Sequence, residues 1–199
     1  QHTVSTGLPF DTQIRLVSEW FNAGERTCEH FADVLGWASR CPTAIPKQGG
    51  WGAILRKRIG DARWPSPAPL PVITEDVTVS VILDGVSVLR EGRSMGNCLA
   101  TPETAYPYVL ACLGGDMLIC RLEATDSPVM CATLAIEKDE TGWSIGDFQT
   151  VGSGIPPARL RHAAKRLVTD LNERQGFGDS TNESDTCLDI PPFLRRTRR

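Results

Sequence analysis

The stretch that decides the fold is residues 116–151, "DMLICRLEATDSPVMCATLAIEKDETGWSIGDFQTV". Three apolar or alternating segments in it, 116–124, 129–138 and 143–151, have the pattern of β-strands. Only the turn-like sequences "TDSP" (125–128) and "DETG" (139–142) separate them. Because connections this short join neighbouring antiparallel strands, we predict an antiparallel meander.

Helical patterns flank this meander. Residues 157–174 carry an apolar stripe at helical spacing, consisting of Leu160, Ala164, Leu167 and Leu171. On the other side, residues 101–115 begin with Thr101 and Pro102, which suit a helix start, although Pro107 is expected to kink this helix or to delay its start.

The segment before that helix is ambiguous. "VTVSVIL" (77–83) alternates like a fourth strand. The Asp84–Gly85 pair that follows favours a hairpin, but Asp84 is equally suited to cap a short helix that ends at Gly92. Local patterns lean slightly towards the hairpin.

The N-terminal part is predicted to be helical over 11–23, 26–39 and 51–59. We expect the first helix to bury Ile14, Val17, Trp20 and Phe21, and the second to bury Cys28, Phe31, Leu35 and Ala38. The predicted fold class is therefore α+β: a small antiparallel meander of three to four strands, packed against helices and preceded by an N-terminal helical part. The predicted organisation is a helical region (1–62), a proline-rich connector (63–76), an α+β domain (77–175) and a polar, flexible tail (176–199).

Composition excludes several functional classes. The net charge of −3 over 199 residues argues against a generally basic nucleic-acid-binding protein. None of the seven cysteines forms a CxxC pair, so we predict neither a metal site nor a cofactor. Without a long apolar stretch or an N-terminal leader, we expect a cytoplasmic protein with no membrane contact.

Cys98 is the first candidate site residue. It precedes a helix N-terminus and follows Arg93, and both features favour a thiolate. A cysteine nucleophile usually needs a base, and His162 is the one histidine in the α+β part. The alternative, which chemistry alone favours, is that Cys98 is a small buried residue beneath the helix.

Two further candidates lie towards the C-terminus. Gln149 precedes the loop "TVGSGIPP" (150–157), which leads into a helix as many ligand-binding loops do. An ordinary strand-to-helix turn is the more common explanation. The last helix carries basic residues that are candidates for contacts with nucleic-acid phosphates, unless they form an ordinary solvated face: Arg159, Arg161, Lys165 and Arg166.

The order of these pieces resembles the PcfJ-like family of conjugative plasmids and other mobile elements. The matching residues of the turn, the helix and the strands are Glu91, Gly92, Met95, Cys98, Tyr108, Gly115, Ala132, Thr133, Leu134, Trp143, Gln149 and Gly152. The resemblance covers about residues 77–172 and implies a short helix at 85–91. Asn97 stands where the family has histidine, and Ile155 and Pro156 stand where asparagine is expected.

The resemblance implies an accessory module of a mobile genetic element, acting through a cleft between the Cys98 turn and the Gln149–Gly154 loop. The candidate catalytic residues are Cys98, Asn97 and Gln149, and the candidate ligand-binding residues are Arg93, Tyr108, Gly152 and Arg159. The alternatives are an enzyme with Cys98 as nucleophile and a nucleic-acid-binding module that uses the basic last helix. A protein partner is also expected.

Overall fold

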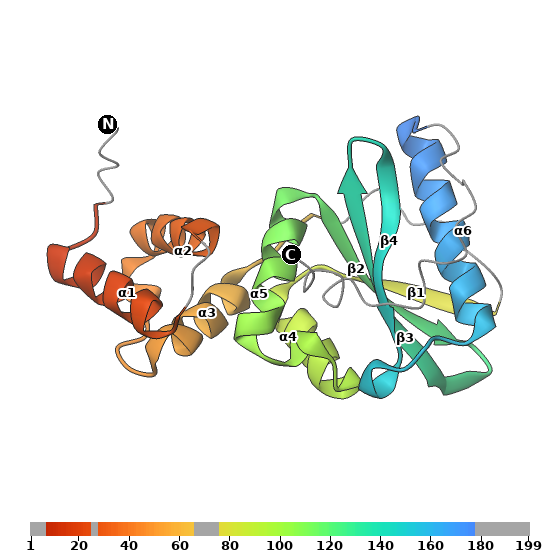
Figure 1. Ribbon diagram of the computed structural model, residues 1–199, viewed down its shortest axis with the longest axis horizontal. Coiled ribbons are helices and arrows are strands. Elements are labelled where there is room, and N and C mark those ends of the chain that lie inside the picture. Colours follow the sequence, from red (N-terminus) through yellow and green to blue (C-terminus); the bar gives the residue numbers. More distant parts are fainter. Residues whose placement is uncertain (1–6, 25–27, 66–75, 178–199) are drawn as a thin grey trace, which may run out of the picture.

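The computed structural model describes residues 7–24, 28–65 and 76–177 of the chain (Figure 1). The N-terminal part contains α1 (Phe10–Asn22), α2 (Cys28–Arg40), the short 3-10 helix η1 (Pro42–Ala44) and α3 (Gly50–Asp61). The elements that follow are β1 (Val77–Ile82), α4 (Gly85–Met95), η2 (Cys98–Ala100), α5 (Pro102–Gly114), β2 (Met117–Ala124), β3 (Ser127–Asp139), β4 (Gly142–Gln149), η3 (Val151–Ser153) and α6 (Ala158–Gln175).

The four strands form one antiparallel sheet in the order β1-β2-β3-β4, so the predicted α+β class and the antiparallel meander are confirmed. The β2–β3 and β3–β4 connections are the two short turns that the sequence indicated. The register aligns Arg121 of β2 with Thr133 of β3, and Thr133 with Gln149 of β4. This register places three polar side chains in one row across the sheet.

Helices cover both faces of the sheet (Figure 1). On one face, α6 buries the predicted stripe of Leu160, Ala164, Leu167 and Leu171 against strand residues such as Leu122 and Leu134. The other face carries α4 and α5, whose Val88 and Val109 share a core with Ile119 and Ala135 of the strands. The row of polar residues lies on this second face, beneath α4.

The ambiguous segment after β1 is a helix, so the hairpin interpretation is wrong. The Asp84 side chain caps α4 by accepting a hydrogen bond from the Ser87 N–H at 2.9 Å. Gly92 does not end the helix. Instead, α4 continues to Met95 and is capped by Gly96, whose left-handed backbone (φ 63°) is typical of the residue after a helix end. Pro107 lies inside α5 without delaying its start at Pro102.

The predicted N-terminal helices are present, but two of their buried faces differ from the prediction. In α1, Leu16 is fully buried, whereas Ile14, Val17 and Phe21 are exposed. In α2, Ala38 is buried as predicted, and Phe31 and Leu35 are partly buried against the core. Cys28 is exposed, however, and the buried residues also include His30, Val34 and Trp37. Both helices carry apolar residues on more than one face, so periodicity alone could not select the buried face.

A single core cluster runs from Leu16 of α1 and Leu55 of α3 to Tyr106 of α5 and Ile119 of β2. Trp64 at the start of the proline-rich connector is buried, and its indole N–H donates to the Ile82 carbonyl at 2.9 Å. Residues 66–75 of the connector and residues 178–199 of the tail lie outside the described residues. The predicted domain boundaries stay a prediction.

Candidate functional site

A small pocket lies between the η2 turn, α5 and the edge strand β4. Its open mouth included, it has a volume of about 220 Å³. Eight residues line it: Asn97, Cys98, Leu99, Tyr108, Thr133, Ala135, Asp147 and Gln149. The turn before α5 and the end of β4, which are far apart in sequence, therefore border one cavity.

The inner wall of the pocket is a buried polar network. Glu91 of α4, which is 6% exposed, accepts a hydrogen bond from the Thr133 hydroxyl at 2.7 Å. It also forms an ion pair with Arg121 at 2.9 Å. Burial acts to lower the pKa of Arg121, but its hydrogen bonds to Glu123 and Glu91 outweigh this and raise it. The buried carboxylate is thus paired, as a buried charge needs to be.

The η2 turn is fixed to this network. The Asn97 side chain accepts from the Leu99 N–H at 3.0 Å and donates to the Thr133 hydroxyl at 3.5 Å. Gly92 allows the turn to approach α4 closely, since a Cβ at this position would lie 2.1 Å from the Leu99 carbonyl carbon. The turn therefore holds Asn97 at the pocket wall by backbone packing as well as by hydrogen bonds.

Two side chains direct hydrogen-bond donors at the second carboxylate of the site, Asp147. Gln149 donates through its amide nitrogen at 2.9 and 3.2 Å, and the Tyr108 hydroxyl donates at 3.5 Å. The Cys98 thiol in turn donates to the Tyr108 hydroxyl at 3.6 Å. Burial raises the pKa of Asp147 despite the hydrogen bonds from Gln149 and Tyr108.

A β-bulge places Asp147 in this pocket. β3 and β4 pair Ile136 with Ile145 and then Ala135 with Asp147, so Gly146 is the extra residue. Trp143 and Ile145 face α6, and strict alternation would turn Asp147 to that face as well. The extra residue reverses the alternation, and Asp147 and Gln149 face the pocket instead.

The structure does not support an activated Cys98. Cys98 is exposed, so the alternative of a small buried residue beneath the helix is wrong. Neighbouring protein atoms nevertheless desolvate its thiol and raise its pKa, and the nearby Asp147 charge acts in the same direction. The Arg93 side chain is exposed on α4 and does not line the pocket. His162 lies exposed on α6, the helix that covers the opposite face of the sheet.

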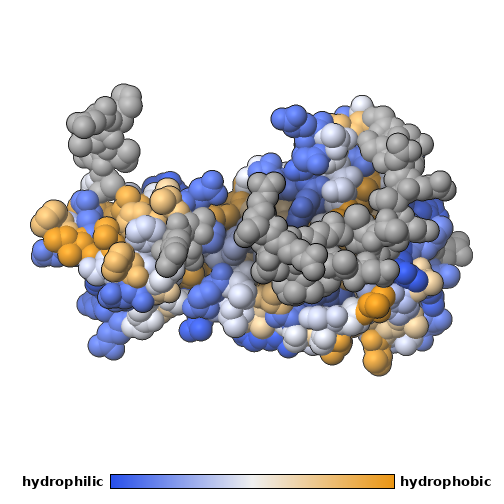
Figure 2. All heavy atoms as spheres, viewed as in Figure 1, coloured by the Kyte–Doolittle hydropathy of each residue, from blue (hydrophilic) through white to orange (hydrophobic). Residues whose placement is uncertain are grey.

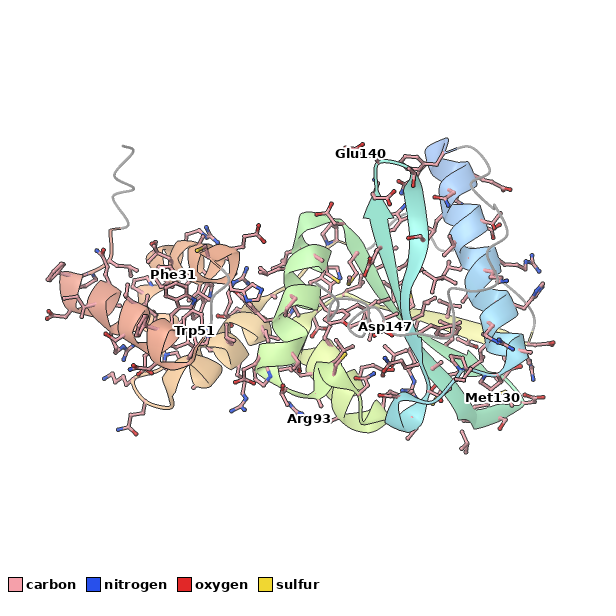
Figure 3. The ribbon with its side chains drawn as sticks, in the orientation of Figure 1. Phe31, Trp51, Arg93, Met130, Glu140 and Asp147 are labelled. Carbon is pink, nitrogen blue, oxygen red and sulfur yellow. The ribbon has the colours of Figure 1, made fainter. Side chains whose placement is uncertain are left out.

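The structure brings four of the seven predicted site residues together, namely Asn97, Cys98, Tyr108 and Gln149. The other three lie elsewhere. Figure 3 shows Asp147 at the middle of β4 and Arg93 at the border of the molecule beside α4. Gly152 packs beside Gly96 at the end of α4. Arg159 forms an ion pair with Asp126 at 2.8 Å and donates to the Asp76 carbonyl. The catalytic and ligand-binding roles assigned to these seven residues stay predictions.

Sequence reasoning missed Asp147 as a site residue and did not single out Glu91 or Thr133 beyond the family resemblance. Asp147 lies two residues from Gln149, and an acidic residue within a short apolar strand is a usable signal. The signal is weak, because the bulge at Gly146 that decides its direction cannot be read from periodicity. The contact between Glu91 and Thr133 depends on tertiary packing between α4 and β3.

Within the described residues, no group of three or more His, Cys, Asp or Glu side chains is arranged to hold a metal ion. No helix among residues 7–24, 28–65 and 76–177 combines the length and the apolar character needed to cross a membrane. The cytoplasmic location expected from the sequence stays a prediction.

Part of the chain is similar to known proteins that share one name. It is 34% identical over 80 residues to a protein named tRNA (guanine-N(1)-)-methyltransferase from Shewanella amazonensis, a match that covers 40% of this chain and 30% of the relative. A protein of the same name from a Marinomonas species is 38% identical over 53 residues, or 27% of this chain and 21% of the relative. The chain thus spans less than a third of the length of these relatives. No protein-family model matches the chain, and no solved structure matches it.

These relatives overturn two predictions. The resemblance to the PcfJ-like family is wrong, since the similar proteins are tRNA methyltransferases and no family model matches. The predicted accessory function in plasmids, conjugation and mobile elements is wrong for the same reason. The two alternatives, a Cys98 nucleophile and a module built on the basic last helix, are no better supported. The predicted short helix was correct, but the Asp84 cap explains it without the family.

Proposed function

We propose that this chain binds tRNA and that its pocket takes up the base edge of an unpaired guanine. The single observation that carries the proposal is the placement of the Asp147 carboxylate in a small, half-open pocket beside two amide side chains and a tyrosine ring. The names of the relatives supply the class of RNA and the base.

The pocket offers hydrogen-bonding groups that complement guanine. The Watson–Crick edge of guanine presents two N–H donors and one carbonyl acceptor. The Asp147 carboxylate accepts hydrogen bonds, and the Asn97 amide nitrogen is a donor. The aromatic ring of Tyr108 lines the same pocket, and aromatic rings are common surfaces on which unstacked RNA bases lie.

The size of the pocket limits what enters it. The volume of about 220 Å³ includes open solvent at the mouth, and the lining residues enclose only about 10 Å³, roughly the space of one water molecule. We therefore propose that only the edge of the base contacts the lining, while the ribose and the phosphates of the nucleotide stay outside. An unpaired nucleotide is required, because the edge of a paired base is occupied by its partner.

The charge state of Asp147 explains how the site would select its ligand. Burial disfavours the charged carboxylate, and none of the described residues that line its pocket is a cation. Two N–H donors from guanine would stabilise that charge. Adenine presents a ring nitrogen acceptor at the equivalent position, and this atom would repel the carboxylate.

Phosphate contacts belong to a different surface. The basic residues of α6 lie on the opposite face of the sheet from the pocket. We propose that Arg161, Lys165 and Arg166 contact the tRNA backbone away from the bound base. Neutralising these three side chains should then weaken binding to all RNAs alike. It should also reduce the slope of log K against log salt concentration by up to about 3 in magnitude.

The test is the binding of the full chain to a tRNA transcript, followed by fluorescence anisotropy. Asp147→Asn should weaken binding about tenfold, which corresponds to the loss of one bidentate base contact. Glu140→Gln makes the same acid-to-amide change at an exposed position in the β3–β4 turn and should bind as the unaltered protein does. Failure of the unaltered protein to bind tRNA at low salt would refute the proposal, as would equal affinity for the Asp147→Asn variant.

A further inference from the structure

The helix α1 exposes a continuous apolar stripe on its outer side. The four side chains are Phe10 (73% exposed), Ile14 (49%), Val17 (46%) and Phe21 (76%). Their spacing of four, three and four residues places them on one face of a helix. Figure 2 shows hydrophobic residues gathered at the α1 end of the molecule. Clustered exposure of this kind is typical of an interaction surface.

The stripe is distinct from the face with which α1 packs on its own chain. Leu16 is fully buried, and the Trp20 ring lies 5.0 Å from that of Phe31 on α2. α1 therefore already contributes to the core through Leu16 and Trp20. The four exposed residues are an additional apolar face that the fold of the described residues does not use.

The stripe reads almost the same in both directions along the helix: aromatic, branched aliphatic, branched aliphatic, aromatic. When two α1 helices pack antiparallel about a two-fold axis, Phe10 meets Phe21 of the second copy and Ile14 meets Val17 of the second copy. A two-fold interface requires such self-complementarity, because each contact occurs twice with the roles exchanged. The spacing of three and four residues is that of a short antiparallel helix pair.

The polar residues beside the stripe agree with this arrangement. In the antiparallel register, Asp11 flanks Ser18 of the second copy and Gln13 flanks Trp20 of the second copy. The charged Arg15 and Glu19 lie outside these flanking positions. No two like charges are brought together, so the pairing carries no repulsion that would oppose it.

We infer that α1 is a homodimerisation surface whose partner is the α1 helix of a second copy of this chain, packed antiparallel. Each copy contributes four side chains, which makes the interface smaller than the roughly 1,200–2,000 Å² of stable complexes. The dimer is therefore in a concentration-dependent equilibrium with the monomer. This inference is independent of the proposed binding of tRNA.

Sedimentation equilibrium of the full chain tests the inference. Between roughly 1 µM and 1 mM, the average mass should rise from 21.7 kDa towards twice that value. Phe10→Lys alone and Phe21→Glu alone should each raise the dissociation constant about tenfold or more, because each places an unpaired charge against a phenylalanine. The positions are exposed, so the fold should survive, and circular dichroism of each variant checks this.

The double variant Phe10→Lys with Phe21→Glu tests the register. Antiparallel packing sets each lysine opposite a glutamate and should restore dimerisation to within about threefold of the original. Parallel packing would oppose lysine to lysine and would give no rescue. Val129→Asp, at an 89% exposed position outside the stripe, is the control and should change nothing. A chain that stays monomeric throughout, or a double variant that is no better than the single ones, would overturn the inference.

Discussion

Helix α5 carries the only two tyrosines of the chain, Tyr106 and Tyr108, on either side of Pro107, and each is hydrogen-bonded to an aspartate. Tyr106 is fully buried and donates to Asp33 of α2 at 2.5 Å. Tyr108 points to the other side of the helix and donates to Asp147 of β4 at 3.5 Å. One helix thus holds two similar pairs in different surroundings.

The two pairs differ in whether a cation completes them. Arg58 binds Asp33 through two hydrogen bonds of 2.8 and 2.9 Å. Burial acts to raise the pKa of Asp33, but the bonds from Arg58 and Tyr106 outweigh it and lower that pKa. Among the residues that the structure describes, no cation lines the pocket of Asp147, and burial raises its pKa. The pair of Tyr106 and Asp33, which Arg58 completes, is called the closed pair and joins α2, α3 and α5. The pair of Tyr108 and Asp147 is called the open pair, and its carboxylate can still accept hydrogen bonds from a ligand.

The largest effect is expected on breaking the closed pair. Arg58→Met should destabilise the protein by about 3 kcal/mol in urea unfolding, because it leaves the Asp33 carboxylate without its buried partner. Lys57→Met, which removes an exposed pair with Asp61 on the same helix, should cost no more than about 0.5 kcal/mol. Equal effects of the two changes would contradict a structural role for the closed pair.

The pH dependence of this effect has a definite sign. The pKa of Asp33 is lower in the folded than in the unfolded protein, so its contribution is complete above the ordinary value of 3.8 and is lost as pH falls through the lower, folded value. The difference between the original protein and Arg58→Met should therefore shrink below pH 3.8.

A change at Gly92 should disturb the η2 turn, whose Cys98 contacts Tyr108 of the open pair, and should leave the closed pair in place. A Cβ there would lie 2.1 Å from the Leu99 carbonyl carbon and 2.3 Å from the Ala100 nitrogen, so Gly92→Ala should displace the η2 turn. We expect a loss of about 2 kcal/mol in unfolding free energy together with weaker binding of RNA. Gly60→Ala is the matched control in helix α3, since a Cβ there meets nothing within 4 Å. A Gly92→Ala variant as stable as this control would show that the turn is not held as described.

The two aspartates should respond in opposite directions to the same substitution. Asp33→Asn should lower the melting temperature at pH 7, because it removes the charge that Arg58 needs. Asp147→Asn should raise it, because the raised pKa of Asp147 means that its charged form is disfavoured in the folded state. That stabilisation should disappear as pH falls through the raised pKa towards 3.8. Melting curves of both variants at pH 7 and pH 4 test the contrast, and shifts of the same sign would refute it.

The smallest effect concerns the cysteines. Cys98 is exposed, as are Cys28 and Cys41, but its raised pKa should make it react with a thiol reagent at pH 7 more slowly than these two. Burial raises the pKa of Cys112 and of Cys120 to about 12, so both should stay unlabelled until the protein unfolds. Peptide-resolved mass spectrometry measures these rates. Faster labelling of Cys98 than of Cys28 would mean that the pocket activates this thiol.

The strands and α6 could be predicted because short turns and one clear apolar stripe define them. The buried face of α1 could not, because Leu16 and Trp20 lie on one apolar face and Ile14 and Val17 on another. Within the site, the sequence pointed to Cys98, Asn97 and Gln149, which do line one pocket. Asp147 was missed because the bulge at Gly146 reverses the alternation of β4, and the two aspartate–tyrosine pairs depend on contacts between distant elements.

The most direct test of the central claim is a thermodynamic cycle between Asp147 and the bound base. Stem-loops that carry either guanine or adenine at one unpaired position are titrated against the original protein and against Asp147→Asn. We predict that the original protein prefers guanine about tenfold and that the variant loses this preference, leaving a coupling of roughly 1–3 kcal/mol. A preference for guanine that Asp147→Asn leaves unchanged, or no preference in the original protein, would contradict it.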